Sequence, residues 1–219
     1  IMSSDWSSDV CSSDLGDSSV TYYGVRNDDT PGPGTVVRGN RFEQHYDGIT
    51  PCNDEEDTQK VSEGATHVLA KWPNHDVEVY DNVFIKHRDD GIEADGVCVN
   101  ARIYRNRVEQ ATNATSISPT LPGPVFFVRN RLRDFKESAV KFNTSKGRGT
   151  IRNVLFYHNT IERIETGTAG ENAPLYLYDG TPSKDITFRN NIFAGKYRCL
   201  VIQNDWVHRP DMDYNLWYT

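Results

Sequence analysis

The sequence predicts an all-β solenoid in which short strands stack coil upon coil. A strand-like pattern that ends in Asn, any residue and an apolar residue recurs six times, and the strands alternate apolar with polar residues. No long stretch shows the periodicity of an amphipathic helix. Strands that recur about every 24 residues leave no room for the crossover helices of βαβ units, so each repeat is expected to form one coil.

Each copy of the repeat is centred on one asparagine. The copies are VVRGNRF at Asn40, VEVYDNVF at Asn82, ARIYRNRV at Asn106, VFFVRNRL at Asn130, VLFYHNTI at Asn159 and ITFRNNIF at Asn191. Successive asparagines lie 42, 24, 24, 29 and 32 residues apart, and a polar insertion over residues 52–67 explains the longest interval. Asparagine tolerates the left-handed conformation of turns, and stacked asparagines form internal ladders, so we expect these residues to be structural.

A second strand follows most of these asparagines. The segments are DGIT at 47–50, DGIEAD at 90–95, AVKFNT at 139–144, PLYLYD at 174–179 and CLVIQN at 199–204. Each coil is therefore expected to contain two or three short strands joined by turns rich in Gly, Asn, Asp and Pro.

Size and charge exclude several classes of protein. The chain has 219 residues and a net charge of −7, which predicts one domain without a sequence-independent grip on nucleic acid. No apolar run of about 18 residues is present, so no membrane-spanning helix is expected. No signal-peptide pattern is visible at the N-terminus. A single solenoid of this kind is expected to be a monomer that binds neither nucleic acid nor membrane.

The first 16 residues differ from the rest of the chain. Residues 3–15 read SSDWSSDVCSSDL, a near-repeat of Ser-Ser-Asp. This stretch resembles a translated sequencing adapter, and the alternative is a disordered polar linker. Residues 1–16 are therefore predicted to be a non-native or disordered leader, and residues 17–219 to form the solenoid domain.

The cysteines do not suggest a disulfide framework. Cys11 lies in the leader, which leaves Cys52, Cys98 and Cys199, an odd number without metal-ligand spacing. We expect these three residues to be buried small side chains.

The recurring N-x-[FVLI] step and the D-G-I strand starts resemble the right-handed parallel β-helix families, the pectate-lyase-like superfold. The resemblance covers about residues 17–219 and implies about six to seven coils. It also implies a carbohydrate-active protein that is extracellular or periplasmic. This fold hosts lyases, hydrolases, epimerases and non-catalytic adhesins, so the chemistry has to be argued from the residues.

The stretch HRDDGIEADG, residues 87–96, holds four carboxylates. If Ile92 and Ala94 face the core, Glu93 and Asp95 face solvent, because successive strand residues alternate sides. Glu93 follows its ladder asparagine by 93 − 82 = 11 residues, and Lys141 follows its own by 141 − 130 = 11. The two residues are therefore expected in one column of a parallel sheet, about 10 Å apart, with a coil of small residues between them.

Further polar and aromatic residues extend this outer face into a predicted polysaccharide groove. The predicted substrate-binding residues are His45, Asp47, Arg88, Asn143, Arg148, Tyr176, Tyr178 and Gln203. The alternative is a solvated face of ordinary polar residues. His45 and His87 precede acids closely and are either general acids or bases, or turn and surface residues.

One candidate chemistry is glycoside hydrolysis. Glu93 and Asp95 would have Cα atoms roughly 6.6 Å apart, within the roughly 6.5–9.5 Å that inverting glycosidases need between carboxyl groups. The stretches around Asp47 and around Asp89 and Asp90 resemble the D-G-I and D-D elements of polygalacturonase-like glycoside hydrolases. The G-H-G and R-x-K motifs of those enzymes are absent.

The other candidate is β-elimination by a polysaccharide lyase, which the sequence favours slightly. Lys141 would be the base that removes the proton α to a uronate carboxylate, and Arg88 or Arg148 would assist. Ca²⁺ would neutralise that carboxylate, held by Asp89, Asp90, Glu93 and Asp95. The predicted catalytic residues are thus Asp90, Glu93, Asp95 and Lys141, and a non-catalytic glycan-binding module remains the third alternative.

Overall fold

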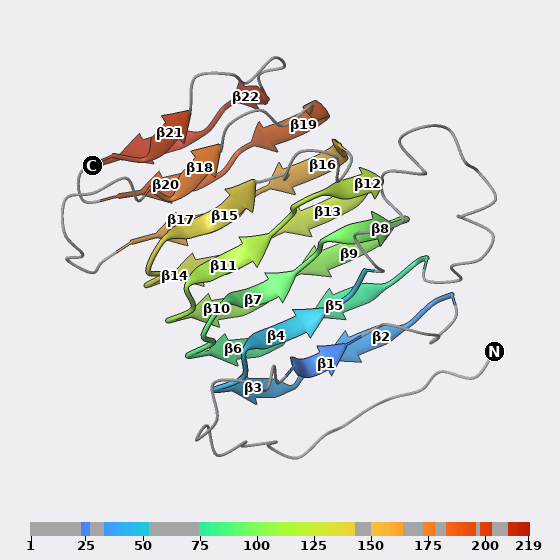
Figure 1. Ribbon diagram of the computed structural model, residues 1–219. Helices are drawn as coiled ribbons and strands as arrows, with labels where there is room; N and C mark the ends of the chain where they lie inside the picture. The colour runs from blue at the N-terminus through green and yellow to red at the C-terminus, as the bar shows by residue number, and fades with distance from the viewer. Residues whose placement is uncertain are drawn as a thin grey trace.

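The computed structural model describes residues 23–26, 33–52, 75–142, 150–163, 173–177, 183–195, 198–202 and 210–219. All regular elements in these ranges are short strands, and the strands stack in parallel to form a β-helix. Figure 1 shows the chain climbing from the blue strand β1 to the red strand β21, one coil at a time. The predicted all-β parallel solenoid is confirmed, whereas the predicted leader lies outside the described residues. No helix in the described part of the chain has the length and apolar character needed to cross a membrane.

Three sheets run along the solenoid, and we call them sheets A, B and C. Sheet A has seven strands, which agrees with the six to seven coils predicted. Its strands are β1 (Tyr23–Arg26), β4 (Asp47–Thr50), β7 (Asp90–Glu93), β11 (Asn113–Ser116), β15 (Ser138–Phe142), β18 (Leu175–Leu177) and β21 (Leu200–Ile202).

Sheet B contains the strand that precedes each ladder asparagine, together with β8 and β12. Its strands are β2 (Val36–Arg38), β5 (Glu78–Tyr80), β8 (Gly96–Cys98), β9 (Ala101–Tyr104), β12 (Thr120–Pro122), β13 (Val125–Val128), β16 (Ile151–Tyr157), β19 (Ser183–Arg189) and β22 (Asp211–Asp213). The long strand β16 pairs with both β12 and β13, because two short strands of one coil continue as one strand in the next.

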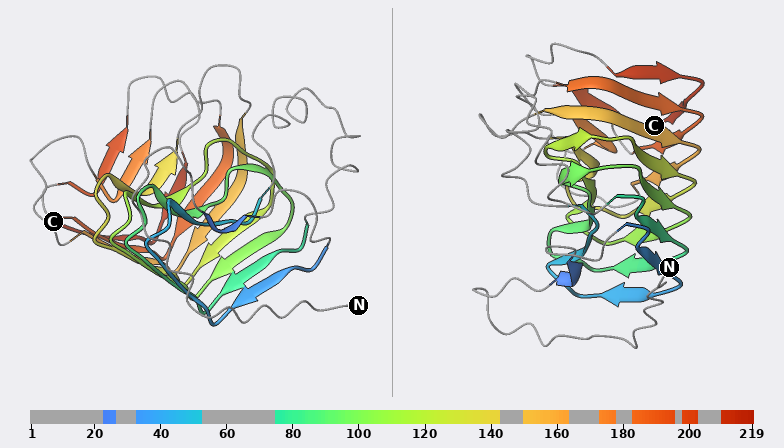
Figure 2. Two further views of the ribbon diagram at one scale, coloured as in Figure 1. Left: turned by 60° about the horizontal axis from the view of Figure 1, so that its bottom comes forward. Right: turned by 90° about the vertical axis from the view of Figure 1, so that its right-hand side faces the viewer.

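Sheet C follows each ladder asparagine. Its strands are β3 (Arg41–Glu43), β6 (Val83–Ile85), β10 (Arg107–Glu109), β14 (Arg131–Arg133), β17 (Thr160–Glu162), β20 (Ile192–Ala194) and β23 (Leu216–Tyr218). Figure 2 shows strands of successive coils lying one above the other in each sheet. Equivalent residues of successive coils therefore form columns along the solenoid.

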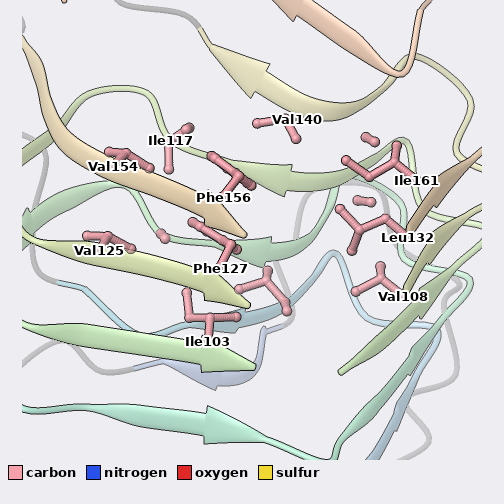
Figure 3. Packing of buried hydrophobic residues seen from close by; sticks show 14 of the residues in the cluster. Ile103, Val108, Ile117, Val125, Phe127, Leu132, Val140, Val154, Phe156 and Ile161 are labelled. Carbon is pink, nitrogen blue, oxygen red and sulfur yellow. The ribbon is translucent and has the colours of Figure 1, made fainter. Parts of the chain in front are cut away.

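The inward-facing columns form one continuous hydrophobic core. Phe127 and Phe156 on neighbouring strands of sheet B stack with ring centroids 4.6 Å apart. Figure 3 shows these rings directed into the interior, opposite Leu132 and Ile161 of sheet C. Each fully buried side chain of this size contributes about 1.5–3 kcal/mol to the free energy of folding, and stacking the same residue type coil after coil keeps the core closely packed.

The asparagine ladder is confirmed at the corner between sheets B and C. The Oδ1 atom of Asn106 accepts hydrogen bonds from the backbone nitrogen and Nδ2 of Asn82, each at 3.1 Å. The Nδ2 atom of Asn106 in turn donates to Asn130 and to the Val79 carbonyl. The ladder also continues one step beyond the six predicted copies, from Asn191 to Asn215.

At this corner the left-handed backbone conformation is adopted by the residue before each ladder asparagine, and not by the asparagine itself. Positive φ values of 54° to 58° occur at Asp81, Arg105, Arg129, His158, Asn190 and Tyr214. The asparagine side chain is thereby free to bond along the solenoid, and the preceding residue makes the turn.

Close packing explains the glycine of the D-G-I strand starts. A Cβ atom on Gly48 would clash with the carbonyl oxygen of Gly91 in the next coil and with the ring of Phe84. The motif that resembles a catalytic element is thus also required for two coils to approach each other.

The cysteine prediction is confirmed for burial, because Cys52, Cys98 and Cys199 are all buried, but it is wrong in expecting no disulfide. Cys52 and Cys98 are joined by a disulfide with Cα atoms 5.0 Å apart, while Cys199 is free and buried. An odd count leaves one cysteine over but does not prevent the other two from pairing. The disulfide connects Cys52, two residues after β4, to Cys98, the last residue of β8, with the polar insertion between them in the sequence.

Candidate functional site

A column of polar side chains runs along the start of the sheet A strands. The pairing of β7, β11 and β15 aligns Asp90 with Asn113 and Ser138. Asp90 Oδ1 accepts a hydrogen bond from Asn113 Nδ2 at 3.0 Å, and Asn113 Oδ1 accepts one from Ser138 Oγ at 2.7 Å. In the preceding coil, Asp47 Oδ1 accepts a hydrogen bond from the Asp90 backbone nitrogen at 2.9 Å. The acids of the D-G-I motifs therefore belong to a buried network that links four coils.

Three carboxylates converge in this network, and we call Asp47, Asp89 and Asp90 the acid cluster. One oxygen from each lies within 4.8 Å of the others. Asp47 comes from the start of β4, while Asp89 and Asp90 come from the turn into β7 in the next coil. Asp47 and Asp90 are buried, and Asp89 is partly exposed.

The position of Asp47 favours its protonated form. Burial raises the pKa of Asp47 to about 8, and the negative charges of Glu93, Asp90 and Asp89 add to this rise. The hydrogen bond from the Asp90 backbone opposes it. Asp47 therefore holds a proton at neutral pH while an ordinary carboxyl group would have lost it.

Lys141 forms an ion pair with Asp90, with Nζ 3.1 Å from Oδ2. Burial raises the pKa of Asp90, and the nearby ammonium of Lys141 limits that rise. Burial alone would lower the pKa of Lys141, but Asp90, Asp95 and Asp89 outweigh it and raise the pKa above its ordinary value. Lys141 is therefore charged at neutral pH, and a charged ammonium cannot accept a proton as the predicted base would have to.

The predicted column across sheet A is confirmed as a strand register. Glu93 pairs with Ser116, Ser116 with Lys141, and Lys141 with Tyr176. Glu93 is partly exposed and accepts a hydrogen bond from Thr50 Oγ1 at 3.0 Å.

The outward orientation predicted for Asp95 is wrong. Asp95 is only 5% exposed. Its Oδ2 accepts a hydrogen bond from Ser116 Oγ at 2.9 Å, and its Oδ1 accepts one from the Ser118 backbone nitrogen at 2.6 Å. Strand alternation ends at this point because β7 ends at Glu93, so Asp95 belongs to the corner between sheets A and B and fixes the next coil there.

The two histidines do not lie on the surface. His45 and His87 are 3% and 1% exposed, and their rings stack with centroids 5.8 Å apart beneath sheet A. Neither ring nitrogen of His87 makes a hydrogen bond with a described residue. Burial and then the charge of His45 lower the pKa of His87 to about 4, and the carbonyls of His45 and Phe42 oppose this only weakly. Burial also lowers the pKa of His45.

The remaining predicted substrate residues are only partly described. Arg88 is exposed next to Asp89. The backbone of Tyr176 lies in β18, in the column of Glu93 and Lys141. The predicted positions of Asn143, Arg148, Tyr178 and Gln203 lie outside the described residues.

The acid cluster fits Ca²⁺ in its donor chemistry, because carboxylate oxygens are the ligands that Ca²⁺ prefers. Asp47, Asp89 and Asp90 would hold the ion, which would take the place of the proton on Asp47 and of the Lys141 contact of Asp90, and it would supply positive charge to neutralise a substrate carboxylate. Asp95, predicted as a ligand, has both oxygens engaged by Ser116 and Ser118. Glu93 contacts Thr50, and the Lys141 ammonium already occupies one side of Asp90.

Sequence reasoning did not group Asp47 with Asp89 and Asp90. The available signal was position, since Asp47 follows Asn40 by 47 − 40 = 7 residues and Asp90 follows Asn82 by 90 − 82 = 8. The D-G-I segments were recognised as equivalent strand starts, but the sequence did not show that the carboxylates of Asp47, Asp89 and Asp90 meet. Comparison of the chain with protein-family models, curated proteins and solved structures gives no match, so the function has to be inferred from the geometry of the acid cluster.

Proposed function

We propose that the protein is a glycoside hydrolase that cleaves a polysaccharide containing acidic sugars on the outer face of sheet A. The observation that carries this proposal is the convergence of Asp47, Asp89 and Asp90 from two neighbouring coils, with one oxygen of each within 4.8 Å of the others. Glycoside hydrolysis needs one carboxyl group that donates a proton and one that is ionised.

Asp47 suits the role of general acid. Its Oδ1 is held by the Asp90 backbone, while its Oδ2 makes no hydrogen bond with a described residue. The pKa of about 8 leaves a proton on this carboxyl group at neutral pH. A general acid works best when its pKa lies near the working pH.

Asp89 suits the role of the ionised partner. It is the partly exposed member of the acid cluster, so it is the carboxylate that a sugar reaches from solvent. A protonated Asp47 and a partly exposed Asp89 supply the two carboxyl groups that glycoside hydrolysis needs.

Asp90 and Lys141 act as positioning residues in this proposal. Both oxygens of Asp90 are engaged, one by Asn113 and one by Lys141. The pair fixes the turn that presents Asp89. Lys141 and the exposed Arg88 also supply positive charge near the cluster, which favours a substrate that carries carboxylates.

Elimination is the second candidate, favoured by the fit of the cluster to Ca²⁺. In that case the three aspartates would bind the ion, which neutralises the uronate carboxylate before the α proton is removed. The charged state of Lys141 argues against it as the base, so this candidate has no described base.

The two candidates differ in their products. We would incubate the protein with pectins, alginates and glycosaminoglycans, with Ca²⁺ or with chelator, and follow reducing ends together with the absorbance of unsaturated uronates. Reducing ends without that absorbance, unchanged by chelator, are expected. Both signals together, lost with chelator, would replace hydrolysis by elimination.

Variants then test the site. Asp47→Asn and Asp89→Asn should each lower the rate by about 100-fold or more, the usual contribution of an acid or base. Asp185→Asn is the matched control, because Asp185 is an exposed residue of β19 in sheet B and lies far along the chain from the acid cluster. Glycan binding without turnover of any substrate would contradict both enzymatic candidates and support a non-catalytic glycan-binding module.

The disulfide supports the extracellular or periplasmic location that we propose for this activity. Disulfides persist in oxidising compartments and are rare in the cytosol. The Cys52–Cys98 bond is buried, at 2% and 1% exposure, and joins the two coils that carry the acid cluster.

A further inference from the structure

The outer face of sheet B carries a column of aromatic side chains that the proposed hydrolysis does not use. Strand pairing places Tyr80, Tyr104, Val128 and Tyr157 at one level of successive coils. The rings of Tyr80 and Tyr104 stack with centroids 4.7 Å apart and planes within 9°. At Val128 the column lacks a ring, so the side chains leave a gap beside Tyr104.

A pocket of about 330 Å³ lies at this gap. We call it the sheet B pocket, and it is lined by Arg102, Tyr104, Arg105, Phe126, Val128 and Arg129. Phe126 and Val128 of β13 are partly exposed there, so the pocket has an apolar floor and three arginines around it. Its volume is at the small end of the roughly 300–1,000 Å³ typical of ligand pockets.

Two of the arginines are already neutralised. Arg102 forms an ion pair with Glu78 at 2.9 Å, and Arg105 forms one with Asp81 at 2.7 Å. Both acids lie in the coil before β9. Asp81, Arg105 and Arg129 occupy the same corner position in three successive coils. The residue that precedes Arg129 in this column is therefore Arg105, and not an acid. Arg129 forms no ion pair with a residue of the described part of the chain, and the pocket therefore has an excess of positive charge.

The aromatic wall of the pocket is fixed in advance. The Tyr104 hydroxyl donates a hydrogen bond to Glu78 Oε2 at 3.1 Å, and the Arg105 guanidinium lies 5.0 Å from the Tyr104 ring centroid. A side chain held by a hydrogen bond, a stacked ring and a cation–π contact loses little conformational freedom when a ligand binds.

From these contacts we propose that the sheet B pocket is a second glycan-binding site, separate from the acid cluster, that takes one uronate unit of an acidic polysaccharide. The sugar ring packs on Tyr104 and Phe126, and its carboxylate pairs with Arg129. Aromatic rings offer apolar surface to sugar faces, and a planar guanidinium binds a carboxylate through two parallel hydrogen bonds. The choice of an acidic glycan rests on the proposed function, whereas the site rests on the pocket and its charge.

The test uses the full chain carrying Asp89→Asn, so that no ligand is cleaved. Binding of a galacturonate oligomer would be measured by calorimetry, with the methyl-esterified oligomer as an uncharged ligand. Arg129→Ala should weaken binding of the acid form about tenfold, as expected for loss of one charge-assisted contact. Arg131→Ala is the matched control, because Arg131 lies two residues away in the same coil but on the outer face of sheet C, and it should leave the affinity within about twofold.

Hydrogen exchange locates the bound oligomer independently. Saturation with the acid oligomer should protect amides of β9 and β13, and Arg129→Ala should remove this protection. Equal loss of affinity in both arginine variants, equal binding of the esterified oligomer, or protection confined to β4 and β7 would overturn the proposal. Binding that depends on Arg129 in a protein without any hydrolytic activity would refute the proposed function and leave this site standing.

Discussion

The asparagine ladder and the aspartate column of sheet A are both buried stacks of polar side chains, but they differ in charge. An amide donates and accepts hydrogen bonds, so each ladder asparagine satisfies its neighbour without charge. A carboxylate only accepts, so Asp47 and Asp90 need a proton, the Asn113 amide or the Lys141 ammonium to be stable in the same kind of position. The neutral stack needs no further partner, whereas the stability of the charged one depends on how its protons and ammonium groups balance its carboxylates.

The largest expected effect is the replacement of the buried, titratable carboxyl group of Asp47 by a neutral amide. Because the pKa of Asp47 is about 8 in the folded protein and about 3.9 when unfolded, the folded state binds this proton more tightly. Its stabilising effect is complete below pH ~4 and is lost as the pH rises to about 8. Asp47→Asn should therefore gain stability relative to the parent, by roughly 4 kcal/mol between about pH 5 and pH 8.

Urea unfolding across this pH range measures that difference, and contributions from the histidines cancel because both proteins share them. Asp185→Asn, at an exposed carboxyl group, should show no such trend. If the free energies of unfolding of the Asp47→Asn variant and the parent changed in parallel with pH, Asp47 would titrate like an ordinary acid.

Substitution of a ladder asparagine should lower the free energy of unfolding only through lost hydrogen bonds, because the ladder carries no charge. Asn106→Ala removes the acceptor of the Asn82 backbone and the donor to the Val79 carbonyl, both buried. Leaving two buried groups unsatisfied costs about 3–4 kcal/mol. Chemical denaturation measures this loss, which should not depend on pH between about 5 and 8. A strong pH dependence would contradict the distinction drawn between the two stacks.

Disruption of the aspartate column should lower the free energy of unfolding by less than disruption of the ladder, because Asp90 can take up a proton. Lys141→Met removes the partner of a buried carboxylate and should cost about 2–3 kcal/mol at neutral pH, below the full cost of an unpaired buried charge. Adding Asp90→Asn turns this step into a neutral, ladder-like one and should recover most of the loss. A double-mutant cycle measures the coupling, and additive losses would show that the ion pair contributes nothing.

The smallest effect is expected at the histidine stack. The pKa of His87 is about 4 in the folded protein and about 6.5 when unfolded, so its contribution is complete above the unfolded value and is lost as the pH falls towards 4. His87→Leu should therefore be more stable than the parent at pH ~5 by about 1–2 kcal/mol. Thermal unfolding at acidic and neutral pH tests this, and an identical shift at both would show that only packing had changed.

Repetition decides how much of this fold could be predicted. Asn82, Asn106 and Asn130 recur at equal intervals with the same flanking pattern, so the solenoid, the ladder and the register from Glu93 to Lys141 could be read from the sequence. Asn215 was missed because its coil lacks the apolar strand before the asparagine.

The candidate site was harder to predict because its features break the repeat. The alternation of inward and outward side chains in β7 predicts that Asp95 faces solvent. In the structure, Ser116 and Ser118 of the next coil hold its carboxylate inside a corner. The pairing of Cys52 with Cys98 and the convergence of Asp47 with Asp90 both span the insertion, where sequence distance says nothing about spatial distance. Burial, which sets the pKa of Asp47, depends on all of these contacts together.

The constant interval of 24 residues between Asn82, Asn106 and Asn130 also has a genetic consequence. An in-frame deletion or duplication of 24 codons would reconnect one asparagine to the next equivalent one, so the gene can lose or gain a whole coil while the ladder stays closed. A duplication of this length that begins directly after Asp90 would move the sheet B pocket one step of the solenoid further from the acid cluster. Unequal recombination thereby offers a route by which descendants of this gene acquire different spacings between the two proposed sugar-binding positions without any new fold.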